Sequence, residues 1–288
     1  MKEFCDHPVA ALESGNLRVE YLTDVGPRLA RLIFAGTNLL AELPDLSQDT
    51  EYGRFHFMGG HRLWHAPEAL PRSYIPDQPV QVELLADGVR LAAGTEPGTG
   101  LAKSMEIRLD ETRPMLTLRH TLRNEGQEDV ECAPWALSML RLGGTLILPQ
   151  PGPTENSLLP NRWLALWPYS RIGDARLHLA DDFILLDANA SLPPLKLGTY
   201  CSAGWAAYWL DGILFVKRFS VEPIAAYPDG GCNLETYCND RFVELETLGP
   251  LIKLQPGQSV THTEIWELHK GLAVDLIPSS LRRALQRQ

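Results

Sequence analysis

Glycine and proline interrupt this sequence so often that no long helix fits into it. There are 23 glycines and 22 prolines among 288 residues, and the longest stretch without either runs from residue 174 to 192. A proline inside a helix costs about 3 kcal/mol and a glycine about 1 kcal/mol. The spacing therefore argues against helical bundles, coiled coils and helical solenoids, and it favours many short strands joined by turns.

Apolar and polar residues alternate along most of the chain, as they do in strands that are buried on one face. Residues 17–21 and 116–122 are examples, and the dipeptide Asp87-Gly88 between two such stretches is typical of a hairpin. No repeat of fixed period is present. We therefore predict an all-β protein, a large twisted antiparallel β-sandwich that spans residues 1–288 as a single domain. Only residues about 279–288 read as a short C-terminal helix, which begins with serine caps.

The net charge and the cysteines indicate which binding partners and which cellular environment to expect. The chain has 26 Lys and Arg against 36 Asp and Glu, a formal net charge of −10. Such a chain repels nucleic acid and anionic membrane surfaces, and it has no apolar run that could span a bilayer and no apolar signal segment at its start. Its five cysteines form no CxxC pair. We expect reduced thiols and a cytoplasmic protein that binds neither nucleic acid nor membrane.

The densest group of reactive side chains lies at residues 54–68, which include three histidines, two arginines and Trp64. Gly59-Gly60 lets a ligand or a second chain segment approach the backbone closely. His61 and His65 have the spacing of zinc ligands on a helix, but no Glu follows His61 and Pro67 disfavours a helix, so we expect no metal. The cluster either binds a ligand and transfers protons, or it consists of hydrogen-bonded loop histidines around a core tryptophan.

A second group of polar residues lies on two neighbouring predicted strands. Because side chains alternate along a strand, Glu244 and Glu246 share one face, and so do Asn233 and Glu235. Carboxyl groups held together on matching faces raise one another's pKa toward the range of a general base. The alternative is an ordinary solvated sheet face.

Several stretches resemble the galactose mutarotase-like (aldose 1-epimerase) superfamily. Residues 243–247 are similar to the strand that bears the catalytic glutamate of mutarotases, and the Pro256-Gly257 turn and the strand at residues 262–268 follow in the same order. Residues 229–237 look like the strand that precedes that glutamate. Gly59-Gly60-His61 lies where mutarotases carry their first active-site histidine.

The resemblance implies a sugar site on the concave face of the sandwich, without metal or cofactor. Glu246 would be the base that removes the proton of the anomeric hydroxyl, and His61 would be the acid that serves the ring oxygen. Mutarotases carry a second histidine near the central strand, where this chain has none at residues 135–139. The expected contacts to the sugar come from the two polar groups above: Arg54, Arg62, Trp64, His65, Asn233, Glu235 and Glu244.

Three functions therefore stay open. The first is an aldose 1-epimerase-like enzyme for a small sugar. The second is a noncatalytic carbohydrate-binding protein on the same scaffold. The third is an epimerase whose arginines, Arg54, Arg62 and Arg72, hold an anionic sugar such as a phosphosugar or a uronate. The sequence leaves the oligomeric state open.

Overall fold

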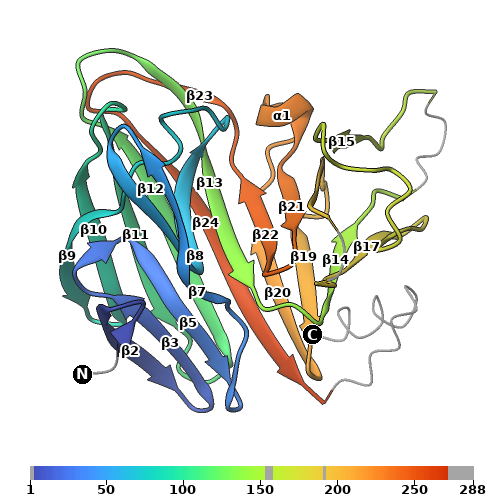
Figure 1. The fold of residues 1–288 in the computed structure, drawn as a ribbon, viewed down its shortest axis with the longest axis horizontal. Coiled ribbons are helices and arrows are strands. Elements are labelled where there is room, and N and C mark those ends of the chain that lie inside the picture. The colour runs from blue at the N-terminus through green and yellow to red at the C-terminus, as the bar shows by residue number, and fades with distance from the viewer. Residues whose placement is uncertain (1–2, 153–157, 191–192, 272–288) are drawn as a thin grey trace.

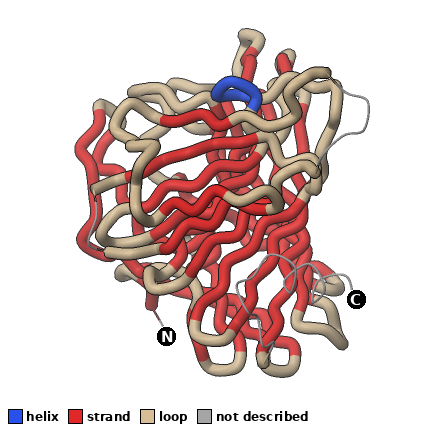
Figure 2. The backbone as a smooth tube through the Cα atoms, turned by 90° about the vertical axis from the view of Figure 1, so that its right-hand side faces the viewer, coloured by secondary structure: helices blue, strands red, loops and turns tan. Residues whose placement is uncertain are grey.

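The computed structural model describes residues 3–152, 158–190 and 193–271. These residues form two large antiparallel sheets that pack face to face (Figure 1). The prediction of an all-β antiparallel sandwich is thus confirmed. The predicted C-terminal helix at residues 279–288 lies outside the described residues. Figure 2 shows α1 (Pro228–Gly231), a single turn, at one end of the strands.

The first sheet has 13 strands in the described part of the chain, and ten of them form one continuous path. In spatial order these ten are β1 (Glu3–Phe4), β2 (His7–Ser14), β3 (Leu17–Leu22), β5 (Arg28–Phe34), β8 (Gly53–Ala66), β13 (Val130–Leu140), β22 (Val243–Leu248), β21 (Leu234–Cys238), β18 (Leu195–Thr199) and β15 (Leu164–Leu166). Three strands pair at the side of this path: β6 (Thr37–Asn38), β7 (Glu42–Thr50) and β23 (Ile252–Leu254).

The second sheet has 11 strands within the same described ranges. In spatial order they are β16 (Leu177–Leu179), β17 (Phe183–Asp187), β14 (Thr145–Pro149), β19 (Trp205–Leu210), β20 (Ile213–Phe219), β24 (Ser259–Lys270), β12 (Met115–Asn124), β11 (Leu101–Leu109), β10 (Gly88–Thr95), β9 (Gln78–Leu85) and β4 (Val25–Gly26). The expected hairpin at residues 80–91 is present as β9 and β10, which pair from Leu85 and Gly88 outward.

The apolar residues of both sheets meet in the space between them. Leu197 and Leu245 of the first sheet and Phe215 and Trp266 of the second belong to one buried cluster. Since side chains alternate along a strand, the residues next to Leu197 and Leu245 point to the opposite, outer face of the first sheet. Lys196, Glu244 and Glu246 are therefore directed away from the second sheet.

Strand β8 changes neighbours in its middle. Its first half pairs with β7, while His61 and Arg62 pair with β5. The switch occurs at Gly59 and Gly60, whose φ angles are +89° and +74°. A Cβ atom on Gly60 would lie 2.1 Å from the carbonyl oxygen of Leu29, so only glycine fits here.

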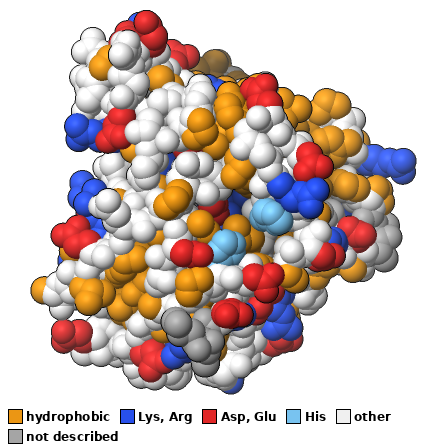
Figure 3. Space-filling model, turned by 60° about the vertical axis from the view of Figure 1, so that its left-hand side comes forward, with side chains coloured by type: hydrophobic (Ala, Val, Ile, Leu, Met, Phe, Trp, Pro, Cys, Tyr) orange, Lys and Arg blue, Asp and Glu red, His pale blue; other side chains and the backbone are white. Residues whose placement is uncertain are grey.

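The surface carries charges of both signs. On the face shown in Figure 3, acidic and basic side chains are interspersed, with apolar side chains between them. Among the helices of the described residues, none is long and apolar enough to cross a membrane.

Candidate functional site

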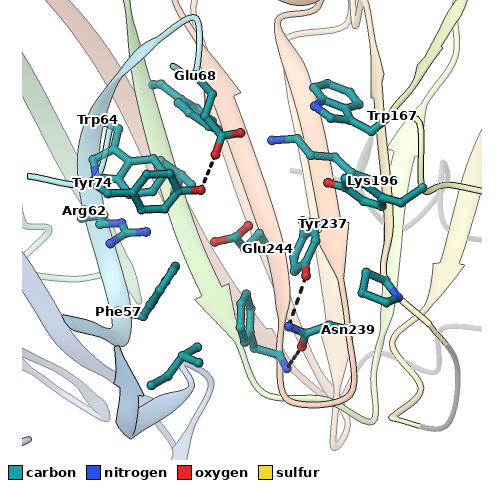
Figure 4. Close-up of a pocket in the computed structure, with 16 residues that line it drawn as sticks. Phe57, Arg62, Trp64, Glu68, Tyr74, Trp167, Lys196, Tyr237, Asn239 and Glu244 are labelled. Atoms are coloured by element: carbon teal, nitrogen blue, oxygen red, sulfur yellow. Dashed lines mark hydrogen bonds between the residues drawn. The ribbon is translucent and has the colours of Figure 1, made fainter. Parts of the chain in front are cut away.

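A cavity of about 500 Å³ opens on the outer face of the first sheet (Figure 4). Strands β8, β13, β21 and β22 supply its floor, and β18 contributes Lys196. Its walls are rich in aromatic rings, including Phe57, Trp64, Tyr74, Trp135, Trp167 and Tyr237. Aromatic faces with a few polar groups between them are suited to the apolar and hydroxyl-bearing surfaces of a small ligand.

Lys196 is the centre of a buried charge cluster at this cavity. Its Nζ lies 3.2 Å from Glu246 Oε2 and 3.1 Å from Glu235 Oε2. The ammonium also lies 4.6 Å from the ring centroid of Trp135 and 4.7 Å from that of Trp167. Glu235 and Glu246 are both 0% exposed. One cation is thus held between two carboxyl groups and two indole rings.

The cluster shifts the pKa values of its members in different directions. Burial opposes the charge on Lys196, but Glu246 and Glu235 outweigh it and hold the pKa of the lysine well above its usual value. Burial, reinforced by Glu246, raises the pKa of Glu235 well above the ordinary carboxyl range. Glu246 Oε2 accepts hydrogen bonds from Trp135 Nε1 at 2.8 Å and from Lys196. Glu246 is therefore the better-stabilised anion of the two.

Glu244 lies two residues before Glu246 on β22 and lines the cavity, where Figure 4 shows its carboxyl group between Arg62 and Tyr237. Burial, together with the nearby charge of Glu246, raises its pKa to about 8. A carboxyl group with that pKa holds its proton at neutral pH. The two glutamates of one strand face thus differ in their surroundings: Glu244 keeps its proton beside Arg62, and Glu246 accepts hydrogen bonds from Lys196 and Trp135.

Arg62 lines the opposite wall from Lys196 (Figure 4). Its guanidinium carbon lies 3.8 Å from the ring centroid of Trp64. The side chain is 3% exposed, and its three nitrogen atoms have no hydrogen-bond partner among the described residues. Burial, followed by the charge of Arg28, lowers the pKa of Arg62 to about 9.

No model of a known protein family matches this sequence, and no curated protein matches it either. Solved structures do match. The Slr1438 protein from Synechocystis sp. PCC 6803 has a TM-score of 0.60 at 15% identity, over 94% of this chain and 99% of that protein. A galactose mutarotase-like protein from Lactobacillus casei has a TM-score of 0.58 at 11% identity, over 91% of this chain and 100% of its own.

A third similar structure, from Escherichia coli K12, is named as a candidate aldose 1-epimerase. It has a TM-score of 0.59 at 15% identity and covers 92% of this chain and 99% of its own. The chain has the galactose mutarotase-like fold. At these identities the likeness concerns the fold, and the chemistry of this mutarotase-like sandwich has to come from its own side chains.

The mutarotase-like sandwich places His61 on the inner side of β8, away from the cavity. Its ring is 0% exposed and lies between the two sheets. His61 Nδ1 is 2.9 Å from Ser138 Oγ, and Nε2 is 2.8 Å from His120 Nε2. His120 Nδ1 lies 3.1 Å from the carbonyl oxygen of His262, to which it must donate.

These contacts fix the protons of the two rings. Burial lowers the pKa of both His61 and His120, so both are neutral at pH 7. His120 Nε2 then accepts from His61 Nε2, and His61 Nδ1 accepts from Ser138. His61, His120 and Glu264 are close enough to be metal ligands, but the histidine nitrogens are occupied by these hydrogen bonds and Glu264 by Lys217, at 2.9 Å.

The other predicted contact residues divide between the cavity and the rest of the molecule. Arg62, Trp64 and Glu244 line the cavity, and Glu235 contacts its lysine. The remaining three lie elsewhere. His65 is buried beside a smaller cavity that Arg72 also lines. Asn233 Oδ1 accepts from the backbone N–H of Cys201, and its Nδ2 donates to the carbonyl oxygen of the same residue. Arg54 is exposed and pairs with Asp49 at 2.9 Å.

Sequence reasoning missed the residue at the centre of the site, Lys196. A signal for it exists, because Leu195 and Leu197 are buried in the core and the alternation leaves the lysine between them on the outer face. Trp135 lies opposite Trp64 in the register of β13 and β8, and both line the cavity. Nothing in the sequence connects Lys196 to Glu246, which is 50 positions away.

Proposed function

We propose that this protein catalyses an aldose 1-epimerase-like reaction on a small sugar bound in the aromatic cavity. The observation that carries the proposal is a pair of carboxyl groups on one strand face: Glu244 lines the cavity, and Glu246 lies behind Lys196 with its Oε1 unpartnered among the described residues. Burial keeps the proton on Glu244, which suits it to be the acid, and the hydrogen bonds that Glu246 accepts from Lys196 and Trp135 suit it to be the base. Glu246 is the base and Glu244 is the acid.

The reaction needs two proton transfers and one bond cleavage. Glu246 removes the proton from the anomeric hydroxyl, while Glu244 gives its proton to the ring oxygen. The bond between the anomeric carbon and the ring oxygen breaks, and the open-chain aldehyde forms. Rotation about the next bond and the reverse transfers close the ring on either face, so both glutamates return to their starting states. His61, which the resemblance suggests as the acid, has no part in this scheme.

Access to Glu246 depends on the two side chains that cover it. Its Oε1 has no hydrogen-bond partner within the described ranges and is the oxygen left for a substrate. Trp135 and Lys196 hold the other oxygen and also line the cavity. We propose that the sugar's hydroxyls draw the Lys196 ammonium aside and expose the carboxylate. The five free cysteines support a reducing, cytoplasmic location for this enzyme.

A second candidate function is noncatalytic sugar binding. It is favoured by one observation, the complete burial of Glu246 behind Lys196. In that case the aromatic walls and the polar groups hold a sugar without opening it.

The two functions are separated by following the interconversion of freshly dissolved α-anomers of glucose, galactose and mannose by polarimetry or NMR. We expect the wild type to accelerate it, Glu246→Gln to abolish the acceleration, and Glu244→Gln to lower it by about 10²- to 10⁴-fold. Glu131→Gln, an exposed glutamate on β13, is the matched control and should keep full activity. Sugar binding by a wild type that accelerates no anomer would establish the binding protein instead.

A further inference from the structure

Arg62 is a buried cation without an anion. Taking a charge out of water is costly unless a partner compensates for it, and unpaired buried charges are correspondingly rare. The guanidinium of Arg62 is enclosed by aromatic rings: Trp64 at 3.8 Å, Phe55 at 5.0 Å and Phe57 at 5.7 Å. Stacking satisfies the faces of the guanidinium but leaves its N–H groups, which lie in its plane, without acceptors.

The charges around Arg62 do not balance. Arg28 is fully buried nearby, and it binds the only carboxylate in direct contact with either arginine in the described part of the chain. That carboxylate belongs to Asp77, 2.7 Å from Arg28 Nη2. Arg28 donates its other hydrogen bonds to the carbonyl oxygens of Phe57 and Gly59. Glu244 faces Arg62 across the cavity (Figure 4), but burial raises its pKa to about 8, so it holds its proton at neutral pH. Glu68 also lines the cavity, but its Oε1 accepts from the Tyr74 hydroxyl, so Arg62 has no anion in direct contact among the described residues.

The opposite end of the cavity is different. Lys196 is matched there by Glu246 and Glu235, so it has no surplus charge to offer a ligand. The two walls of the cavity therefore differ in charge: Lys196 has carboxyl partners, whereas Arg62 has no anion in direct contact among the described residues. Figure 4 shows the two side chains on opposite sides of the cavity. A ligand with a negative group at one end complements this arrangement, whereas a neutral sugar leaves Arg62 unpaired.

We propose that Arg62 binds an anionic oxygen-bearing group, a carboxylate or a phosphate, so that the ligands of this cavity are acidic aldose derivatives. The planar guanidinium offers two parallel N–H groups to such an anion. The inference rests on the proposed function for the sugar part of the ligand, but it concerns binding and requires no catalysis. Of the three arginines considered from the sequence, Arg62 alone lines the cavity, since Arg54 is bound to Asp49 and Arg72 lies by His65.

Titration calorimetry at low ionic strength tests the proposal with glucose, galactose and mannose, their uronates and their 6-phosphates. Charge-assisted hydrogen bonds to Arg62 should make at least one acidic derivative bind about tenfold to a hundredfold more tightly than its neutral parent. The uronate and phosphate arms show which anion the site takes. If every acidic derivative binds within threefold of its parent, or if none binds at 10 mM, the proposal is wrong.

Two variants locate the effect. Arg62→Met should remove the preference for the acidic sugar, and Arg62→Lys should keep the charge but lose most of the preference because it lacks the planar pair of donors. Arg54→Met, at an exposed arginine, should leave the preference unchanged. A preference that survives in Arg62→Lys and Arg62→Met would overturn the assignment. An anion preference without any mutarotation would refute the proposed catalysis alone, and mutarotation of neutral sugars without a preference would refute this inference alone.

Discussion

Replacing Lys196 by methionine should destabilise the protein far more than removing an exposed lysine. The variant leaves Glu235 and Glu246, both 0% exposed, without the ammonium that now lies 3.1 and 3.2 Å from them. Breaking a buried ion pair by removing one partner costs about 3–5 kcal/mol, because the remaining charge stays buried. Lys253→Met is the matched control: that lysine is 65% exposed, and its pair with Asp129 at 3.0 Å is worth about 1 kcal/mol at most.

Urea unfolding at pH 7.5 and pH 5, followed by circular dichroism, measures both losses. In the Lys196→Met variant, burial keeps the pKa of Glu235 high in the folded state, and the lysine that lowers it is gone. The folded variant therefore binds protons more readily than the unfolded chain, and its stability rises as the pH falls. The cost should be largest at pH 7.5 and smaller at pH 5. A cost equal to that of Lys253→Met at pH 7.5 would show that Lys196 is not the counter-ion of these carboxyl groups.

Two further variants test the acid and the backbone. The pKa of Glu244 is raised from 4.5 to about 8 in the folded protein, so the folded state keeps a proton that the unfolded chain loses. The wild type's free energy of unfolding should therefore fall between pH 5 and pH 8, and Glu244→Gln should lack that part of the fall; parallel profiles would contradict the assignment. Gly60→Ala should cost about 1–3 kcal/mol in urea unfolding from backbone strain alone, and more from the clash with Leu29. Gly94→Ala, where the added Cβ meets nothing within 4 Å, should cost little, and equal losses would refute the steric argument.

The β-sandwich could be predicted because the sequence pattern that indicates strands extends along the whole chain. Alternation and turn residues recur in nearly every segment, and the stretches at 17–21 and 116–122 lie within the strands Leu17–Leu22 and Met115–Asn124. A misjudged residue in such a pattern does not change the class of fold. The described residues end at residue 271, so the helix at 279–288 stays a prediction.

The candidate site was only partly predictable, and β8 shows why. Gly59-Gly60 suggests a loop, but both glycines lie within a strand of 14 residues, at its change of neighbours. Once β8 is known to be a strand, alternation separates Arg62 and Trp64, which face the cavity, from His61 and His65 on the inner side. Sequence order alone gives no reason to prefer one set to the other.

Glu246 illustrates a second limit. The alternation at residues 243–247 correctly directs it and Glu244 to one face, opposite Leu245. What differentiates the two glutamates is their surroundings, chiefly the Lys196 ammonium and the Trp135 N–H. Those contacts come from strands that are distant in sequence, and only the assembled sheet brings them together.

The hydrogen-bonded histidines between the sheets have a consequence for how the two layers are stacked. The hydrophobic effect is non-directional, so apolar contacts alone do little to fix the alignment of two packed sheets. Ser138 and His61 of one layer meet His120 of the other through hydrogen bonds with a fixed order of donors and acceptors. This chain of hydrogen bonds sets the alignment of one sheet on the other. Protonating His120 would oppose its Nε2–H to the Nε2–H of His61 across 2.8 Å, so acid should break this hydrogen bond before it disrupts the surrounding apolar contacts.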